Sequence, residues 1–180
     1  MRALLVTYGS LLVVWQLAGD AEVLNRQLLP TPTDIAWALF ELTLSGGLLV
    51  DIFASLRRVI VGFLIAGTIG ICLAFAMAIN IQLSRLVSPT VELVRPIPPI
   101  AWIPVAILWF GIGDGSAYFV VAIGTFFPIF TNTFFGIKSL NKRYKLAALS
   151  LGAAKRNYVV DILLPSSLPA IFTGLKLGLG

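Results

Sequence analysis

Long apolar runs separated by short polar or charged segments dominate the sequence. Apolar residues fill 3–18, 59–79, 89–110 and 116–137, and a further run opens at about residue 167. A helix that crosses a membrane needs about 20 such residues. The pattern therefore predicts an all-α, polytopic membrane bundle in which these runs are the spans. A single domain accounts for the whole chain.

The first and the last run are short for spanning helices. For 3–18 a secretory signal peptide is the alternative, with Arg2 as its charged region, but no clean small-residue cleavage site follows, so a retained helix is favoured. The run from 167 holds only about 14 residues, too few to cross a ~30 Å core at 1.5 Å per residue. The sequence therefore reads as a chain truncated at its C-terminal end.

The segments between the runs differ in charge, and this difference predicts their side of the membrane. Residues 20–51 are acidic and are expected to form an amphipathic external loop, in which Leu29 to Asp34 make a turn that leads into a helix. Residues 138–165 are basic and are expected to be cytosolic, since Lys and Arg accumulate in cytoplasmic loops. The N-terminus and a turn at 80–88 then also lie in the cytosol. Only Arg57 and Arg58, at the external end of the second span, depart from the rule.

Composition narrows the classes of function. Apolar residues make up 58% of the 180 residues, whereas soluble domains hold about 45–50%. The net charge of +5 sits in a few loops rather than on one continuous face, which argues against binding to nucleic acid. The chain has no histidine and one cysteine, Cys72, so metal sites, disulfides and the commonest general base are not expected. We therefore predict a protein in contact with membrane lipid that is not an enzyme, with no catalytic residue and no metal.

The basic segment 138–165 predicts two short helices joined at Gly152. Tyr144, Ala147 and Ala148 share one face of the first helix, while Leu146 and Leu149 project from the opposite face. Gly152 permits a sharp reversal, and an amphipathic pattern resumes until Pro165. Two interpretations stay open: a helix that docks to a soluble partner, or a helix that lies on the membrane surface.

Several motifs resemble one family. The spacing of Ala147-Ala148, Gly152 and Ile162-x-Leu164-Pro165 resembles the signature loop of bacterial ABC importer permeases (the MetI-like fold). Other segments resemble the branch that imports nitrate, sulfonates, taurine and bicarbonate; they are Leu28 to Pro32, Ser55 to Val59, Arg95 to Pro104, Trp109 to Gly113, Phe126 to Ile129 with Asn132-Thr133, and Leu164-Pro165 with Leu168-Pro169.

The resemblance implies a function and a set of partners. It implies the translocation subunit of an ATP-driven importer in the bacterial inner membrane, paired with a second permease copy, cytosolic ABC ATPase subunits and an extracytoplasmic solute-binding protein. ATP and Mg²⁺ would bind the ATPase and no cofactor would bind this chain. The residues it implies for ATPase coupling are Tyr144, Leu146, Ala147, Ala148, Leu149, Gly152, Ile162, Leu164 and Pro165. Leu146 stands where the family usually has Glu, so we expect docking to rely on the apolar Leu146 and Leu149.

The candidates for a solute pathway are Arg57, Arg58, Arg95, Pro98, Pro99, Trp102 and Asn132. Within 89–110, Pro96, Pro98, Pro99 and Pro104 must kink or unwind the helix, and irregular backbone is tolerated at membrane depth where it is packed in protein or lines a wet cavity.

Each candidate also has a simpler explanation. The prolines can reflect packing of a bent helix, and Arg95 can pair with Glu92 one turn earlier. Arg57 and Arg58 can reach external headgroups instead of attracting an anion. For Asn132 with Thr131 and Thr133, hydrogen bonds between helices are favoured over contact with a solute.

Two other classes are ranked below the importer subunit. An ion-driven secondary transporter usually has carboxylates at membrane depth, but the only acids outside the loops, Glu92 and Asp114, lie near span ends. A membrane-embedded enzyme would need paired carboxylates, histidine or metal ligands. The chain also lacks a GxxxxGK[ST] loop, so we expect a separate subunit to hydrolyse ATP.

Overall fold

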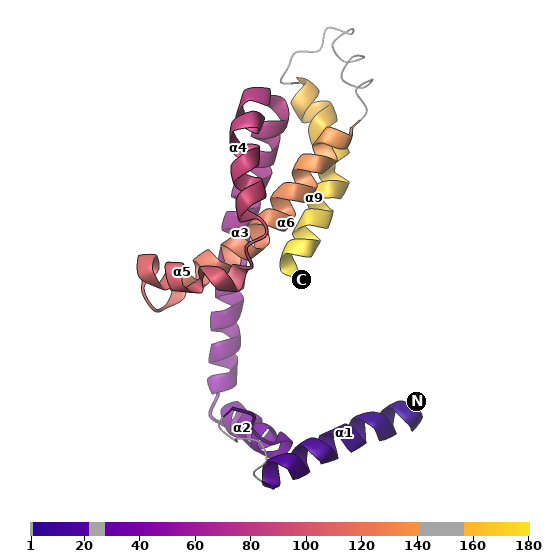
Figure 1. Ribbon diagram of the computed structural model, residues 1–180, viewed down its shortest axis with the longest axis vertical. Coiled ribbons are helices and arrows are strands. Elements are labelled where there is room, and N and C mark those ends of the chain that lie inside the picture. Colours follow the sequence, from indigo (N-terminus) through magenta and orange to yellow (C-terminus); the bar gives the residue numbers. More distant parts are fainter. Residues whose placement is uncertain (1, 22–27, 141–156) are drawn as a thin grey trace. The chain divides into compact units, whose positions relative to one another are not determined.

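The computed structural model describes residues 2–21, 28–140 and 157–180, and every regular element in these ranges is a helix (Figure 1). The chain divides into two units, Met1–Ser55 and Leu56–Gly180. Three helical segments are long and apolar enough to cross a membrane: Gly47–Ile79, Asp114–Ser139 and Tyr158–Leu179. The expectation of an all-α, polytopic membrane protein is confirmed.

The first unit contains α1 (Arg2–Asp20) and α2 (Pro32–Leu44). Thr31 caps α2: its side chain accepts from the Asp34 N–H at 3.3 Å, and the Asp34 carboxylate accepts from the Thr31 N–H at 3.1 Å. This reciprocal arrangement satisfies donors that a helix start leaves unpaired, and Pro32 suits the first turn because it has no N–H to lose. The predicted turn leading into a helix is confirmed.

α1 and α2 are held together by polar contacts. The Gln16 side chain donates to Thr33 Oγ1 at 3.0 Å, and the Thr33 N–H donates back to Gln16 Oε1 at 3.2 Å. Thr31 is buried against Gly19, where a β-carbon would overlap the Thr31 methyl group. The predicted run 3–18 lies within α1, and its role as a span stays a prediction.

α3 (Gly47–Ile79) has 33 residues, which is about 50 Å at 1.5 Å per residue and more than a ~30 Å core requires. The predicted span 59–79 is its C-terminal part, so the helix extends twelve residues before that span. Its residues from Leu56 onward belong to the second unit.

The turn predicted at 80–88 is wrong, because α4 (Ile81–Val94) begins directly after Asn80. The Asn80 side chain accepts from the N–H groups of Gln82 and Leu83, at 3.0 and 3.2 Å. One extended residue with a capping side chain is therefore enough to start a new helix. In Figure 1, α4 lies alongside the end of α3 that leads to Ile79.

The predicted span 89–110 is two elements rather than one helix. α4 ends at Val94, and the short 3₁₀ helix η1 (Pro99–Trp102) continues into α5 (Ile103–Phe110). α4 and the η1–α5 segment meet at 95°. Pro96, Pro98 and Pro99 fall at this corner, where proline removes backbone donors and prevents α-helical continuation, so the predicted break is present.

α5 turns into α6 (Asp114–Ser139) through Gly111 and Gly113, which have φ angles of 74° and 150°. Both angles lie where side chains with a β-carbon are strained, so glycine is required at both positions. The Gly111 N–H also closes α5 by donating to the Ile107 carbonyl at 2.8 Å.

The prediction that Pro165 ends a helix is wrong. A π-helical turn, η2 (Tyr158–Leu163), passes directly into α9 (Leu164–Leu179), and together they form a 22-residue span. A π turn is wider than an α turn, so it relieves the clash between a proline ring and the preceding turn. The last span is therefore longer than the 14 residues expected from 167.

Packing in the second unit centres on α6. Ala74 and Met77 of α3 are buried against Phe130 and Phe134 of α6, and side chains of α4 pack on this cluster. On another side, Gly174 of α9 meets the backbone of Ile129: a β-carbon on Gly174 would lie 3.0 Å from the Ile129 Cα. α6 thus contacts α3, α4 and α9.

Candidate solute pathway

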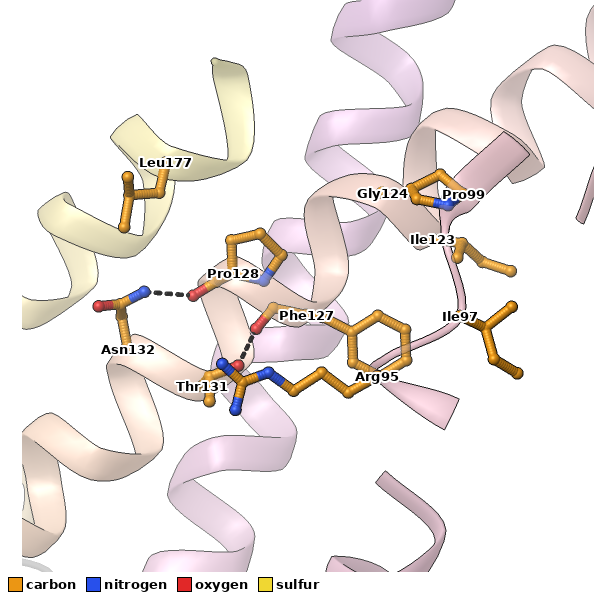
Figure 2. A pocket seen from close by; sticks show the side chains of 10 residues that line it. All are labelled: Arg95, Ile97, Pro99, Ile123, Gly124, Phe127, Pro128, Thr131, Asn132 and Leu177. Atoms are coloured by element: carbon orange, nitrogen blue, oxygen red, sulfur yellow. Dashed lines mark hydrogen bonds between the residues drawn. The ribbon is translucent and has the colours of Figure 1, made fainter. Parts of the chain in front are cut away.

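A cavity of about 440 Å³ lies beside the corner between α4 and η1. Arg95, Ile97 and Pro99 line it from the corner, while residues of α6 and Leu177 of α9 form the rest of the wall (Figure 2). The α6 residues that line it are Ile123, Gly124, Phe127, Pro128, Thr131 and Asn132. Its volume is in the range of small-molecule sites, about 300–1,000 Å³.

Proline 128 creates the polar part of this wall. It has no N–H, so the Gly124 carbonyl loses its usual partner within α6. One turn later, Thr131 Oγ1 donates to the Phe127 carbonyl, and Asn132 Nδ2 donates to the Pro128 carbonyl at 2.8 Å. These bonds stay within α6, and among the described residues neither side chain bonds to another helix. The Thr133 hydroxyl is buried and has no hydrogen-bond partner within the described part of the chain.

Arg95 contributes the only formal charge among the described residues that line this cavity. It is the C-terminal cap of α4, and its backbone N–H donates to the Val91 carbonyl at 2.9 Å. Its side chain is exposed, and no hydrogen bond or ion pair joins it to any residue in the described ranges, Glu92 included. The expected i, i+3 pair between Glu92 and Arg95 is therefore absent.

A second cavity, of about 250 Å³, shares Arg95 and Thr131 with the first as lining residues. It is more apolar: Met77, Phe130, Phe134 and Phe135 line it together with Ser88, Val91 and Glu92. Arg95 and Thr131 thus line both a cavity that contains a carboxylate and one that does not.

Of the other candidates from 89–110, only Pro99 lines the first cavity. The Pro99 ring lines the first cavity and packs on Gly124, where a β-carbon would lie 3.3 Å from Pro99 Cγ. Trp102 does not line this cavity; it packs edge-on against Phe119 at 6.5 Å between ring centroids. Its indole nitrogen is buried without a hydrogen-bond partner in the described chain. Pro98 lies at the corner but is not a lining residue.

Arg57 and Arg58 are held at another place, the start of α6. Both guanidinium groups bind the carboxylate of Asp114: Arg57 contacts Oδ2, and Arg58 Nε donates to Oδ1 at 2.7 Å. Neither arginine lines either of the two cavities beside Arg95. The negative charge of Asp114 offsets one of the two positive charges, so one positive charge remains. Arg57 and Arg58 therefore depart less from the rule that basic residues lie on the cytosolic side.

Asp114 is the residue of this group that the sequence did not single out as a partner. It is 56 residues from Arg58, so no local spacing predicts the pair. The only signal is its place directly after the Gly111–Gly113 turn, which sets it at the first position of α6. Thr131, Phe127 and Pro128 were also not chosen as pathway residues, since nothing in the sequence shows which face of α6 borders a cavity.

The residues expected to couple to an ATPase are only partly described. Tyr144, Leu146, Ala147, Ala148, Leu149 and Gly152 lie outside the described residues. Ile162 lies in the π turn and is half-buried, whereas Leu164 and Pro165 lie at the start of α9 and are exposed. As for a metal, the described residues contain no group of three or more potential ligands.

Comparison with known proteins identifies the family. Residues 66–180, well over half of the chain, match the model of the family described as binding-protein-dependent transport system inner membrane component. The chain belongs to this family. The matched region contains α4, η1, α5, α6 and α9, and therefore includes every residue that lines the two cavities.

Individual relatives agree with this assignment. An ABC transporter permease protein of Methanocaldococcus jannaschii is 38% identical over 172 residues, which cover 93% of this chain and 64% of the relative. The taurine transport system permease protein of Escherichia coli is 33% identical over 97% of this chain and 65% of its own length. The nitrate import permease protein of a Synechocystis species is 35% identical over 97% of this chain and 66% of its own length. The chain thus spans slightly less than two thirds of these relatives.

Proposed function

We propose that this chain is the transmembrane permease subunit of an ATP-driven importer and forms part of the translocation pathway for a small anionic solute. The observation that carries the proposal is the family match over residues 66–180, which contains the whole cavity wall. Relatives named for nitrate and taurine support a small solute with an anionic group. Nitrate, a sulfonate, taurine and bicarbonate are the candidates.

The continuous helix from Tyr158 to Leu179 supports a route for coupling. A force applied to the segment before Tyr158 would reach α9 without a break, because the π turn and α9 form one rod. α9 meets α6 where Gly136 faces Ala170 and where Gly174 faces Ile129. Motion of α9 would therefore displace α6 and Leu177, and with them the cavity wall.

The proposed partners follow from this role. Cytosolic ABC ATPase subunits would bind residues 138–165 and hydrolyse ATP, so this chain would not be an enzyme itself. A second permease copy would complete the pathway, and an extracytoplasmic binding protein would deliver the solute. The protein would lie in the inner membrane with its N-terminus in the cytosol.

Copurification with the ATPase subunit tests the proposal. The intact permease, expressed with its ATPase, is expected to retain it through detergent extraction, whereas Leu146→Asp is expected to lose it because a charge replaces an apolar contact. Asn141→Asp adds the same charge at a polar position of the same segment and should retain the ATPase. Failure of the unaltered permease to bind the ATPase would contradict the proposed function, and equal retention by Leu146→Asp would reject the apolar docking contact.

A further inference from the structure

We propose that Arg95 is the counter-charge of an anion-binding site in the 440 Å³ cavity, so that the solute passes through this cavity as an anion paired with the guanidinium. This inference rests on the proposed transport function and deepens it, because it assigns the selection of an anionic solute to one residue, Arg95. The class of ligand is a small oxyanion, such as nitrate or a sulfonate group.

The first argument is electrostatic. Arg95 is the only charged residue among the described residues that line the cavity, and no carboxylate faces it there. By contrast, Arg57 and Arg58 are both engaged by Asp114. Arg95 lies in a bent helix pair that is a candidate membrane span or re-entrant loop, and charged residues at membrane depth normally face a partner or a wet cavity. An anion in the cavity supplies the partner that the described residues do not.

The second argument concerns the hydrogen-bonding groups of the wall. The Thr131 hydroxyl donates to the Phe127 carbonyl, so its proton is not available to a ligand. Asn132 uses one of its two amide hydrogens on the Pro128 carbonyl and keeps the other. Arg95 has five N–H donors in a planar fork that matches the geometry of an oxyanion. The recognition therefore depends on Arg95, with Asn132 as a second donor.

The third argument concerns the second cavity. Of the two cavities that Arg95 borders, Glu92 lines only the second. Its negative charge repels an anion, so the two cavities favour different occupants although Arg95 borders both. Glu92 also provides a matched control, since it is one helical turn from Arg95 and forms no ion pair with it.

Charge-specific chemical rescue tests the site in the complete complex. Cys72 is the only cysteine of the sequence, so Cys72→Ser removes the only native thiol of this chain. A cysteine introduced at position 95 is then the only thiol that this sequence contributes to the complex. In this background Arg95→Cys is expected to lower ATP-driven uptake of labelled nitrate about tenfold or more, the size expected for loss of a charged hydrogen-bonding partner. Modification with a cationic methanethiosulfonate reagent should restore part of the uptake, and an anionic reagent of the same length should not.

Three further variants keep the test decisive. Arg95→Gln should lose nitrate uptake while Arg95→Lys keeps part of it, and Glu92→Gln should not lower it. Equal uptake by Arg95→Gln and the unaltered protein, or rescue by both reagents, would overturn the role of Arg95 and leave the transport function intact. Absence of ATP-driven uptake of nitrate, taurine and bicarbonate by the unaltered complex would overturn the transport function and, with it, this inference.

A phospholipid headgroup has the same anionic chemistry as the solute, so the vesicles must separate the two sources. The loss caused by Arg95→Gln should be equal in vesicles of phosphatidylcholine and in vesicles that contain phosphatidylglycerol. A loss seen only with phosphatidylglycerol would identify a lipid as the partner of Arg95 and overturn the solute site.

Discussion

Arg58 Nε donates to Asp114 Oδ1 at 2.7 Å, and this contact ties α3 to the first turn of α6. Arg57 binds the other carboxylate oxygen, so two successive residues of α3 hold one residue of α6. The carboxylate also lies at the N-terminus of α6, where the helix dipole favours a negative charge. The three side chains remain partly exposed, with 36% to 59% of each accessible.

Loss of this carboxylate should weaken the junction between α3 and α6. Because exposed ion pairs contribute little to stability, Asp114→Asn should lower the free energy of unfolding in detergent only slightly. Thermal unfolding of the purified protein measures this change. Asp51→Asn, an exposed carboxylate of α3, is the control and should have no effect. If the Asp114→Asn and Asp51→Asn variants unfolded at the same temperature, the ion pairs of Asp114 with the two arginines would not contribute to stability.

Close contact between α3 and α6 depends on the absence of a side chain at Gly62. A β-carbon there would lie 2.7 Å from Val121 Cγ1 and 3.0 Å from the Tyr118 carbonyl oxygen, and the backbone atom has little freedom to move. Gly62→Ala should therefore destabilise the protein by about 1–3 kcal/mol.

Gly67 lies on the same helix and provides the matched control. A β-carbon at Gly67 would have no neighbour nearer than 3.8 Å, so Gly67→Ala should be tolerated and should benefit from the better helix propensity of alanine. The melting temperatures of Gly62→Ala and Gly67→Ala, measured in the same detergent, test this prediction. A larger fall in melting temperature for Gly67→Ala would contradict the contact between α3 and α6 at Gly62.

The contact between α6 and α9 can be tested by adding a β-carbon at Gly136 and then removing the one at Ala170. A β-carbon on Gly136 would overlap the β-carbon of Ala170, so Gly136→Ala should impair both stability and ATP-driven uptake. Adding Ala170→Gly removes the overlap, and the double variant should recover most of the loss. A double-mutant cycle measures the coupling, which is expected to be about 0.5–3 kcal/mol for residues in contact. Additive effects would mean that the two positions do not meet.

The sequence predicted the helices well where one physical signal dominates. Apolar runs predicted the spans in α3 and α6, the prolines predicted a break before η1, and the turn chemistry before α2 predicted its start. These features depend on local chemistry, which a single sequence records.

The features that escaped prediction depend on tertiary context. Proline 165 was expected to stop a helix, but a π turn accommodates it. Arg58 and Asp114 meet only because α3 and α6 pack side by side. That Arg95 has no partner among the described residues depends on which groups surround the α4–η1 corner. The roles of Arg95, Pro99 and Asn132 in transport stay predictions, with the cavity as their structural support.

The most direct measurement is the energy source of uptake by the complete permease–ATPase complex in sealed proteoliposomes. If the chain is the permease of an ATP-driven importer, nitrate or taurine uptake should require ATP on the ATPase side. Uptake should also persist when a protonophore and a sodium ionophore collapse the ion gradients. Uptake that proceeds without ATP and stops when the gradients collapse would contradict this role, and would identify an ion-driven transporter instead.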